Sequence, residues 1–120
     1  MRVDPNHPHI LYMFARTRCL ARYRGCEMNL TREFIADLCQ QNCYYCGNPP
    51  AQKGRAGVRY NGIDRFNNLG GYTMDNCVPA CGTCNRWKRE EEFPDFIDTA
   101  RRIVRKWGMY GDEKEVKSCQ

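Results

Sequence analysis

The sequence has no apolar run long enough to cross a bilayer. It also lacks the apolar stretch of a signal peptide, because Asp4, Pro5, His7 and His9 interrupt the N-terminal residues. These absences predict a protein without membrane contacts in a reducing, intracellular compartment. Histidine is scarce too, since His7 and His9 are the only two, so imidazole chemistry is confined to the N-terminus.

Cysteine, in contrast, is abundant. The chain has 9 cysteines, and an odd number excludes a fully paired oxidised scaffold. Four of them form two Cys-x-x-Cys pairs, Cys43 with Cys46 and Cys81 with Cys84, which together supply the ligands of a closed tetrahedral zinc site. We therefore predict zinc, with a disulfide framework or buried free thiols as the alternatives. The cysteines outside the pairs are expected to behave as small hydrophobes: Cys19, Cys26, Cys39, Cys77 and Cys119.

Basic residues outnumber acidic ones by 19 to 14, which gives a net charge of +5, and 14 of the basic residues are arginine. The planar arginine fork binds phosphate oxygens bidentately, whereas lysine acts more as a point charge. The composition thus indicates a phosphate-bearing partner such as nucleic acid. A solvated basic surface is the alternative.

A chain of 120 residues fits one compact domain, 1–120, and a structural zinc would add about 10 to 16 kcal/mol of apparent folding energy. The N-terminal helices are predicted within 8–41. The first runs from Pro8 to Arg24 and stops at Gly25, and Thr31 caps the second. The apolar stripe of the first helix is expected in the core: Ile10, Met13, Phe14, Leu20 and Ala21.

The last predicted helix spans 93–108 and ends at Gly108, and residues 111–120 are predicted to be a flexible tail. Its apolar residues recur at helical spacing on one seam, and its arginines and Lys106 line the other side, facing water or nucleic acid. The seam consists of Phe93, Phe96, Ile97, Ala100, Ile103, Val104 and Trp107.

The predicted zinc core, 43–90, follows the order strand, turn, strand, helix. Residues 58–63 extend as a strand toward Asp64, a turn follows at 67–71, and 72–73 with 76–79 return antiparallel. A short helix then carries Asn85 to Lys88. Tyr72 and Trp87 suit either core packing or base stacking, and packing is favoured.

Four segments of this core resemble one family: Gly62-Ile63-Asp64-Arg65, Gly71-Tyr72-Thr73, Asp75 to Pro79, and Cys81 to Lys88. They resemble the HNH (His-Me finger, ββα-metal) endonucleases of phage or viral type with a four-cysteine zinc site. The resemblance implies an α+β fold, with a small zinc-stapled ββα-metal core flanked by N-terminal and C-terminal helices. If a phage encodes the chain, its compartment would be the host cytoplasm.

The resemblance also implies a function, the hydrolysis of phosphodiester bonds, with DNA favoured as the nucleic acid. Asp64 and Asn85 stand where the family holds one divalent metal, magnesium or manganese, against the scissile phosphate. Such ions prefer hard oxygen ligands and stabilise developing negative charge. Asp64 as a turn residue and Asn85 as an ordinary helix-start residue are the structural alternatives.

One position departs from the family, because Arg65 replaces the histidine that acts as general base. Arginine stays protonated near neutrality and does not accept a proton. Three accounts follow. The chain is an active nuclease in which the metal or Asp64 activates water and Arg65 neutralises charge, a catalytically degenerate nucleic-acid-binding module, or a zinc-stabilised protein-interaction adaptor.

Side chains close to the site in sequence complete the predictions. Asn67, Arg86 and Lys88 are candidate phosphate contacts, with solvation as the alternative for each. No segment identifies itself as a dimer face, so we expect a monomer or weak dimer.

Overall fold

The computed structural model describes residues 3–112, and side chains over 3–108. The first helix, α1, spans Pro8–Arg24 as predicted. Pro8 occupies its first turn, and Gly25 ends it in the left-handed region at φ 67°. The second helix, α2, spans Arg32–Leu38, and the Thr31 hydroxyl accepts a hydrogen bond from the Phe34 amide at 3.0 Å, which is the predicted cap.

The main hydrophobic core lies between α1, α2 and the segment that contains Tyr72. Tyr72 is buried there, which confirms the prediction of packing, whereas Trp87 is 67% exposed and the same prediction for it is wrong. The core residues are Ile10, Met13, Ala21, Leu30, Ile35, Ala36, Leu38, Cys39, Tyr72 and Cys77.

The predicted strand over 58–63 is in fact two strands. β2, Arg59–Tyr60, pairs antiparallel with β1, Gln52–Lys53, across the short 3-10 helix η1, Arg55–Gly57, and β3 begins only at Gly62. The break falls at Asn61, which has no exposed surface and whose side chain donates to the carbonyls of Gln41 and Asn48 at 2.8 and 3.3 Å. These bonds fix the chain where a continuous strand would have run on.

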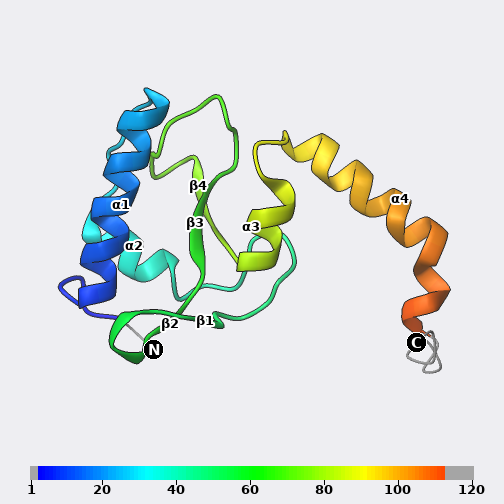
Figure 1. Ribbon diagram of the computed structural model, residues 1–120, viewed down its shortest axis with the longest axis horizontal. Helices are drawn as coiled ribbons and strands as arrows, with labels where there is room; N and C mark the ends of the chain where they lie inside the picture. The colour runs from blue at the N-terminus through cyan, green and yellow to red at the C-terminus, as the bar shows by residue number, and fades with distance from the viewer. Residues whose placement is uncertain (1–2, 113–120) are drawn as a thin grey trace.

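The functional core is a hairpin followed by a helix (Figure 1). β3, Gly62–Arg65, pairs antiparallel with β4, Cys77–Ala80, with Asp64 opposite Val78. The helix α3, Gly82–Lys88, follows directly. The returning strand is shorter than predicted, because Tyr72 forms an isolated parallel bridge with Met28 instead of joining β4.

The last helix, α4, spans Phe93–Asp112 and extends away from the rest of the molecule (Figure 1). The prediction that Gly108 ends it is wrong, because an interior glycine costs only about 1 kcal/mol of helix stability. The predicted tail, 111–120, is helical at its first two residues, and 113–120 lie outside the described residues. Within 3–112 no helix is long and apolar enough to cross a membrane.

Candidate active site and metal centre

The four cysteines of the two predicted pairs lie together. Their sulfur atoms are all within 4.8 Å of one another, and the Sγ atoms of Cys46 and Cys81 are 3.7 Å apart. Four sulfurs that each lie about 2.3 Å from a central zinc are about 3.8 Å apart in a tetrahedron. The cluster therefore has the size and the ligand set of a tetrahedral sulfur site.

Backbone contacts explain why the sulfurs converge. The first pair sits on a tight turn in which the Gly47 amide donates to the Cys43 carbonyl at 2.9 Å, with Gly47 at φ 83°. The Tyr44 amide donates to the Pro79 carbonyl at 2.8 Å, which joins this turn to β4. Cys81 then caps α3, since its sulfur accepts from the Cys84 amide at 3.4 Å.

The thiols of the cluster differ in acidity. Burial raises the pKa of Cys43, but backbone hydrogen bonds, the strongest at Cys81, outweigh burial and lower that pKa to about 7. Burial, followed by the hydrogen bond with Cys46, raises the pKa of Cys84. Ionising all four thiols therefore requires a compensating cation, and thiolates are ligands that zinc prefers. The donor set fits zinc.

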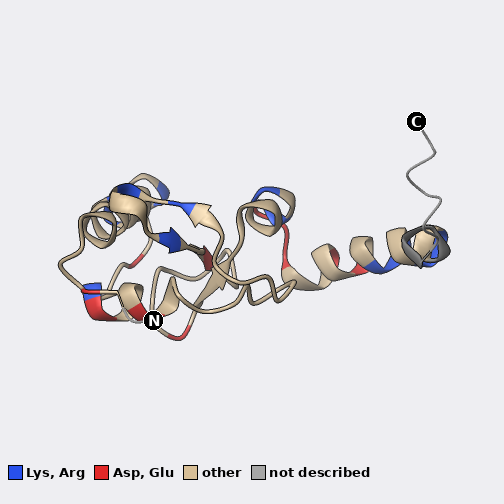
Figure 2. Cartoon of the chain, turned by 90° about the horizontal axis from the view of Figure 1, so that it is seen from below, with Lys and Arg blue, Asp and Glu red and all other residues tan. Residues whose placement is uncertain are grey.

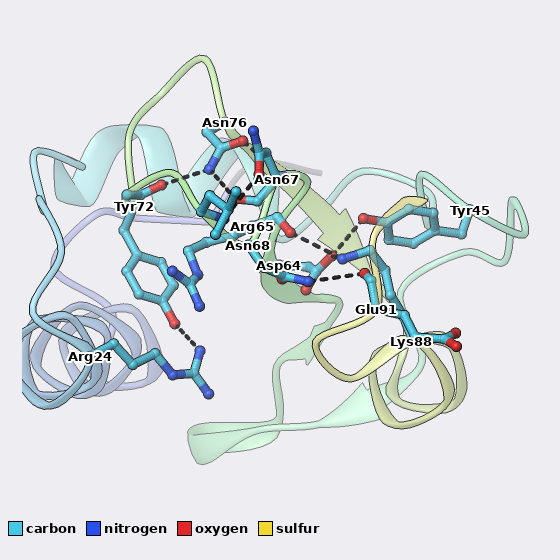
Figure 3. A network of polar contacts seen from close by, with 12 residues as sticks. Arg24, Tyr45, Asp64, Arg65, Asn67, Asn68, Tyr72, Asn76, Lys88 and Glu91 are labelled. Carbon is cyan, nitrogen blue, oxygen red and sulfur yellow. Dashed lines mark hydrogen bonds and ion pairs between the residues drawn. The ribbon is translucent and has the colours of Figure 1, made fainter. Parts of the chain in front are cut away.

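Asp64 is 7% exposed and two donors hold its side chain. The Tyr45 hydroxyl donates to Oδ2 at 2.5 Å, and the Lys88 Nζ lies 3.3 Å from the same oxygen (Figure 3). Burial and this hydrogen bond raise the pKa of Tyr45, so its hydroxyl remains a proton donor. Among the described residues no donor contacts Oδ1, which leaves that oxygen available to a ligand.

Lys88 has no exposed surface. Besides its ion pair with Asp64, its Nζ donates to the Arg65 carbonyl at 3.2 Å and lies 5.8 Å from the centre of the Tyr45 ring. A buried ammonium is tolerated only where it is paired in this way. The prediction of Lys88 as a phosphate contact is therefore wrong, because a side chain without exposed surface does not reach a bound nucleic acid.

Asp64 and Asn85 line the same cleft, which has a volume of about 840 Å³. The Asn85 Nδ2 on α3 lies 3.6 Å from the position that a Cβ atom on Gly62 would take. Gly62 is two residues before Asp64, and alternate residues of a strand share a face. Both side chains therefore approach the same face of β3, where a Cβ atom on Gly62 would be in ordinary van der Waals contact with Asn85.

Arg65 also lines the cleft but is 7% exposed. Its Nη1 donates to the Gly70 carbonyl at 2.9 Å, and its guanidinium lies 5.2 Å from the centre of the Tyr72 ring. Arg65 thus ties the loop after β3 to the core. Neither His7 nor His9 is among the residues that line this cleft. The pKa of His9 is lowered, mainly by burial and secondly by the positive charge of Arg55.

The other predicted phosphate contacts lie outside the cleft lining. Asn67 is exposed, and its Oδ1 accepts a hydrogen bond from the Leu69 amide at 2.9 Å. Its backbone amide donates to Asn76 Oδ1 and its carbonyl accepts from Asn76 Nδ2, both at 3.0 Å. These bonds make Asn67 a residue that shapes the loop. Arg86 is exposed on α3 and is not among the residues that line the cleft. Asn68, not Asn67, lines the cleft, and its Nδ2 donates to the Glu91 carbonyl at 2.9 Å (Figure 3).

The wall opposite α3 was missed at the sequence level. Tyr12, Arg16, Leu20 and Arg24 of α1 all line the cleft. Residues four apart share one face of a helix, so the spacing 12, 16, 20, 24 was a readable signal for this stripe, of which only Leu20 belongs to the predicted core stripe. Across the cleft stand Arg89 and Glu90, just after α3. The cleft that holds Asp64 is therefore lined by arginines from α1, from β3 and from the segment after α3.

Comparison with known proteins adds the fold family. No protein-family model matches the chain. The solved structure of the rare-cutting HNH restriction endonuclease PacI matches with a TM-score of 0.60 and 21% sequence identity, covering 85% of this chain and 81% of that chain. The fold is that of an HNH endonuclease.

A viral relative is closer in sequence. An uncharacterized protein of Acanthamoeba polyphaga mimivirus is 35% identical over 101 residues, which are 81% of this chain and 17% of that protein. The chain thus spans about a sixth of the length of the curated relative that it matches. The HNH fold accounts for the order β3, β4, α3, with Asp64 on its first strand and Asn85 on its helix.

Proposed function

We propose that the chain is a metal-dependent endonuclease that hydrolyses phosphodiester bonds in DNA. One observation carries the proposal: Asp64 on β3 and Asn85 on α3 line one cleft of an HNH fold. In this proposal the two side chains hold a magnesium or manganese ion, and the four-cysteine cluster holds a structural zinc. A carboxylate and an amide oxygen suit a hard cation that keeps several waters and shares its remaining sites with phosphate.

The bound divalent ion would supply Lewis acidity toward the phosphate and the leaving oxygen. Other residues of the chain orient the side chains that would hold this ion. Tyr45 and Lys88 both engage Oδ2 of Asp64, so Oδ1 would be the oxygen that holds the ion. Because Lys88 neutralises part of the charge on Asp64, the ion needs the phosphate as a further anionic ligand, which favours metal binding together with substrate.

DNA is the proposed partner because arginines border the site. Arg16 and Arg24 on α1 and Arg89 after α3 all line the cleft, and their guanidinium groups would contact phosphates near the scissile bond. Arg65, fixed by Gly70, would add a stationary positive charge. Zinc binding by thiolates also requires reduced cysteines, which supports an intracellular setting, and the viral relative supports a host cytoplasm.

The test is cleavage of supercoiled plasmid with and without magnesium by the wild type, Asp64→Ala and Asn85→Ala. We expect each variant to lose about a hundredfold or more of the rate, the scale for losing one preorganised group at a developing charge. The matched controls are Asp75→Ala and Asn42→Ala, which change two exposed residues, and both variants should cleave as the wild type does. Equal cleavage by the wild type and both site variants would refute the proposal.

A second candidate is a nucleic-acid-binding module without catalysis. The ion pair of Lys88 with Asp64 and the lack of an imidazole at the cleft favour it. Such a module would retard DNA in a gel shift that weakens with salt, and Arg16→Ala would reduce binding, yet no added metal would produce cleavage. Magnesium-dependent nicking that Asp64→Ala abolishes excludes this candidate.

A further inference from the structure

The short connection between α3 and α4 reaches the cleft. Residues 90–92 are three glutamates, and they form the red connection between the two helices in Figure 2. Arg89 and Glu90 line the cleft, whereas Glu91 and Glu92 do not. Among the described residues, Glu90 and Asp64 are therefore the two carboxylates that line this cleft.

The backbone of this connection is strained at Arg89. The Glu91 amide donates to the Lys88 carbonyl at 2.8 Å, which closes a four-residue turn, and Arg89 occupies the second position of that turn at φ 50° and ψ −121°. These angles are those of a type II′ turn, whose second position is normally a glycine because a side chain is strained there. Strain of this kind persists where the surrounding structure enforces it, and it is concentrated at functional sites.

Contacts with β3 and the loop after it hold both ends of this turn. At its first residue, Lys88 forms the buried ion pair with Asp64 at 3.3 Å. At its last residue, the Glu91 carbonyl accepts a hydrogen bond from Asn68 Nδ2 at 2.9 Å (Figure 3). The backbone that carries Glu90 is therefore fixed relative to Asp64.

The Glu90 carboxylate is free, although arginines surround the cleft. Within residues 3–108 it forms no hydrogen bond or ion pair, whereas Asp64 is engaged by Tyr45 and Lys88. The arginines that line the cleft are Arg16, Arg24, Arg65 and Arg89. A negative charge at this place opposes phosphate binding, so binding alone does not explain it. An unengaged carboxylate can accept a proton, and no histidine lines the cleft to do so.

We propose that Glu90 is the general base of this cleft, an inference that rests on the proposed nuclease function. Glu90 accepts a proton from a water molecule while the oxygen of that water bonds to phosphorus. The bond from phosphorus to the leaving sugar oxygen breaks, its electron pair stays on that oxygen, and the oxygen takes a proton from solvent. Glu90 then returns its proton to solvent, which restores the carboxylate.

The first test compares cleavage with DNA binding in Glu90→Gln, which keeps the shape of the side chain and removes its charge and basicity. Single-turnover cleavage in magnesium should slow at least about a hundredfold, the scale of general-base catalysis. Binding of duplex DNA in buffer without magnesium, measured by fluorescence anisotropy, should tighten about twofold to fivefold, because the cleft loses a negative charge. A residue that only supported the fold would not slow cleavage and tighten binding together.

The second test supplies a carboxylate from solution. Glu90→Ala should lose about as much of the cleavage rate as Glu90→Gln, and added formate should restore at least about tenfold of it. Chloride at the same ionic strength should restore nothing. The matched controls are Glu92→Gln and Glu92→Ala, which change an exposed glutamate outside the cleft lining and should cleave as the wild type does. Circular dichroism and zinc content check that each variant is folded.

Several results would overturn the proposal. Cleavage by Glu90→Gln at the wild-type rate would do so and would leave the proposed nuclease intact. A loss that excess magnesium reverses would make Glu90 a metal ligand, and a loss accompanied by weaker DNA binding would make it a structural residue. No response of Glu90→Ala to formate would also contradict the general base. A wild type that does not cleave DNA would refute the nuclease and this inference together.

Discussion

The four-cysteine cluster and the proposed Asp64–Asn85 site share the helix α3, yet the chain completes the first and leaves the second open. The cluster supplies four ligands within 4.8 Å of one another. The proposed second site would have one carboxylate and one amide as ligands, and both side chains line a cleft. A closed ligand set is typical of structural metals, and an open position is typical of catalytic ones. The two sites also touch, because Tyr45 sits between Cys43 and Cys46 and donates to Asp64.

Loss of one cysteine from the four-cysteine cluster should have the largest effect on the protein. Cys46→Ser removes one of four zinc ligands, and we expect loss of about one zinc per chain together with loss of cooperative unfolding, since structural zinc contributes on the order of 10 kcal/mol. Elemental analysis and thermal unfolding measure both. Cys19→Ser, at an exposed cysteine on α1, is the matched control and should keep its zinc. A stable Cys46→Ser protein without zinc would show that the cluster is not a structural site.

The buried ion pair behind the open site ranks second. Lys88→Met leaves the Asp64 carboxylate without its buried counter-charge, and breaking such a pair costs about 3 kcal/mol, which lowers Tm by roughly 10 °C. The double variant Lys88→Met with Asp64→Asn should recover most of this loss, because no unpaired charge remains. Differential scanning calorimetry of the four proteins measures the coupling. Additive losses in the double variant would show that the pair contributes nothing as a pair.

The contact between the two sites should have the smallest effect. Tyr45→Phe keeps the packing of the ring but removes the hydroxyl that orients Asp64, and outer-shell changes of this kind cost about tenfold in metal affinity. Cleavage should therefore require about ten times more magnesium, with little change at saturating metal. Tyr44→Phe, the neighbouring exposed tyrosine, is the control. An unchanged magnesium requirement would remove Tyr45 from the site.

Parts of the fold and of the candidate site can be predicted from the sequence. The four cysteines were predictable because Cys-x-x-Cys spacing almost dictates their joint use, and α1 because Pro8 and Gly25 mark its ends. Burial of a lysine was not predictable, because Lys88 is stabilised by Asp64, 24 positions earlier, and by the Arg65 carbonyl. The break at Asn61 likewise depends on distant carbonyls of Gln41 and Asn48.

The last helix shows the limit of periodicity most clearly. The spacing from Phe93 to Trp107 correctly predicts an amphipathic helix, but spacing reports only that one face is apolar and not what covers it. In the structure that face meets the body at Phe93 and Phe96 and is more than half exposed at Val104.

The central claim, that Asp64 and Asn85 share one metal, is tested most directly by anomalous diffraction from crystals soaked in manganese. The account predicts one manganese peak in the cleft, about 2.1 Å from Oδ1 of Asp64 and from the amide oxygen of Asn85, with Tyr45 and Lys88 still on Oδ2. A cleft without manganese, or a manganese bound by neither residue while zinc occupies the cysteines, would contradict it.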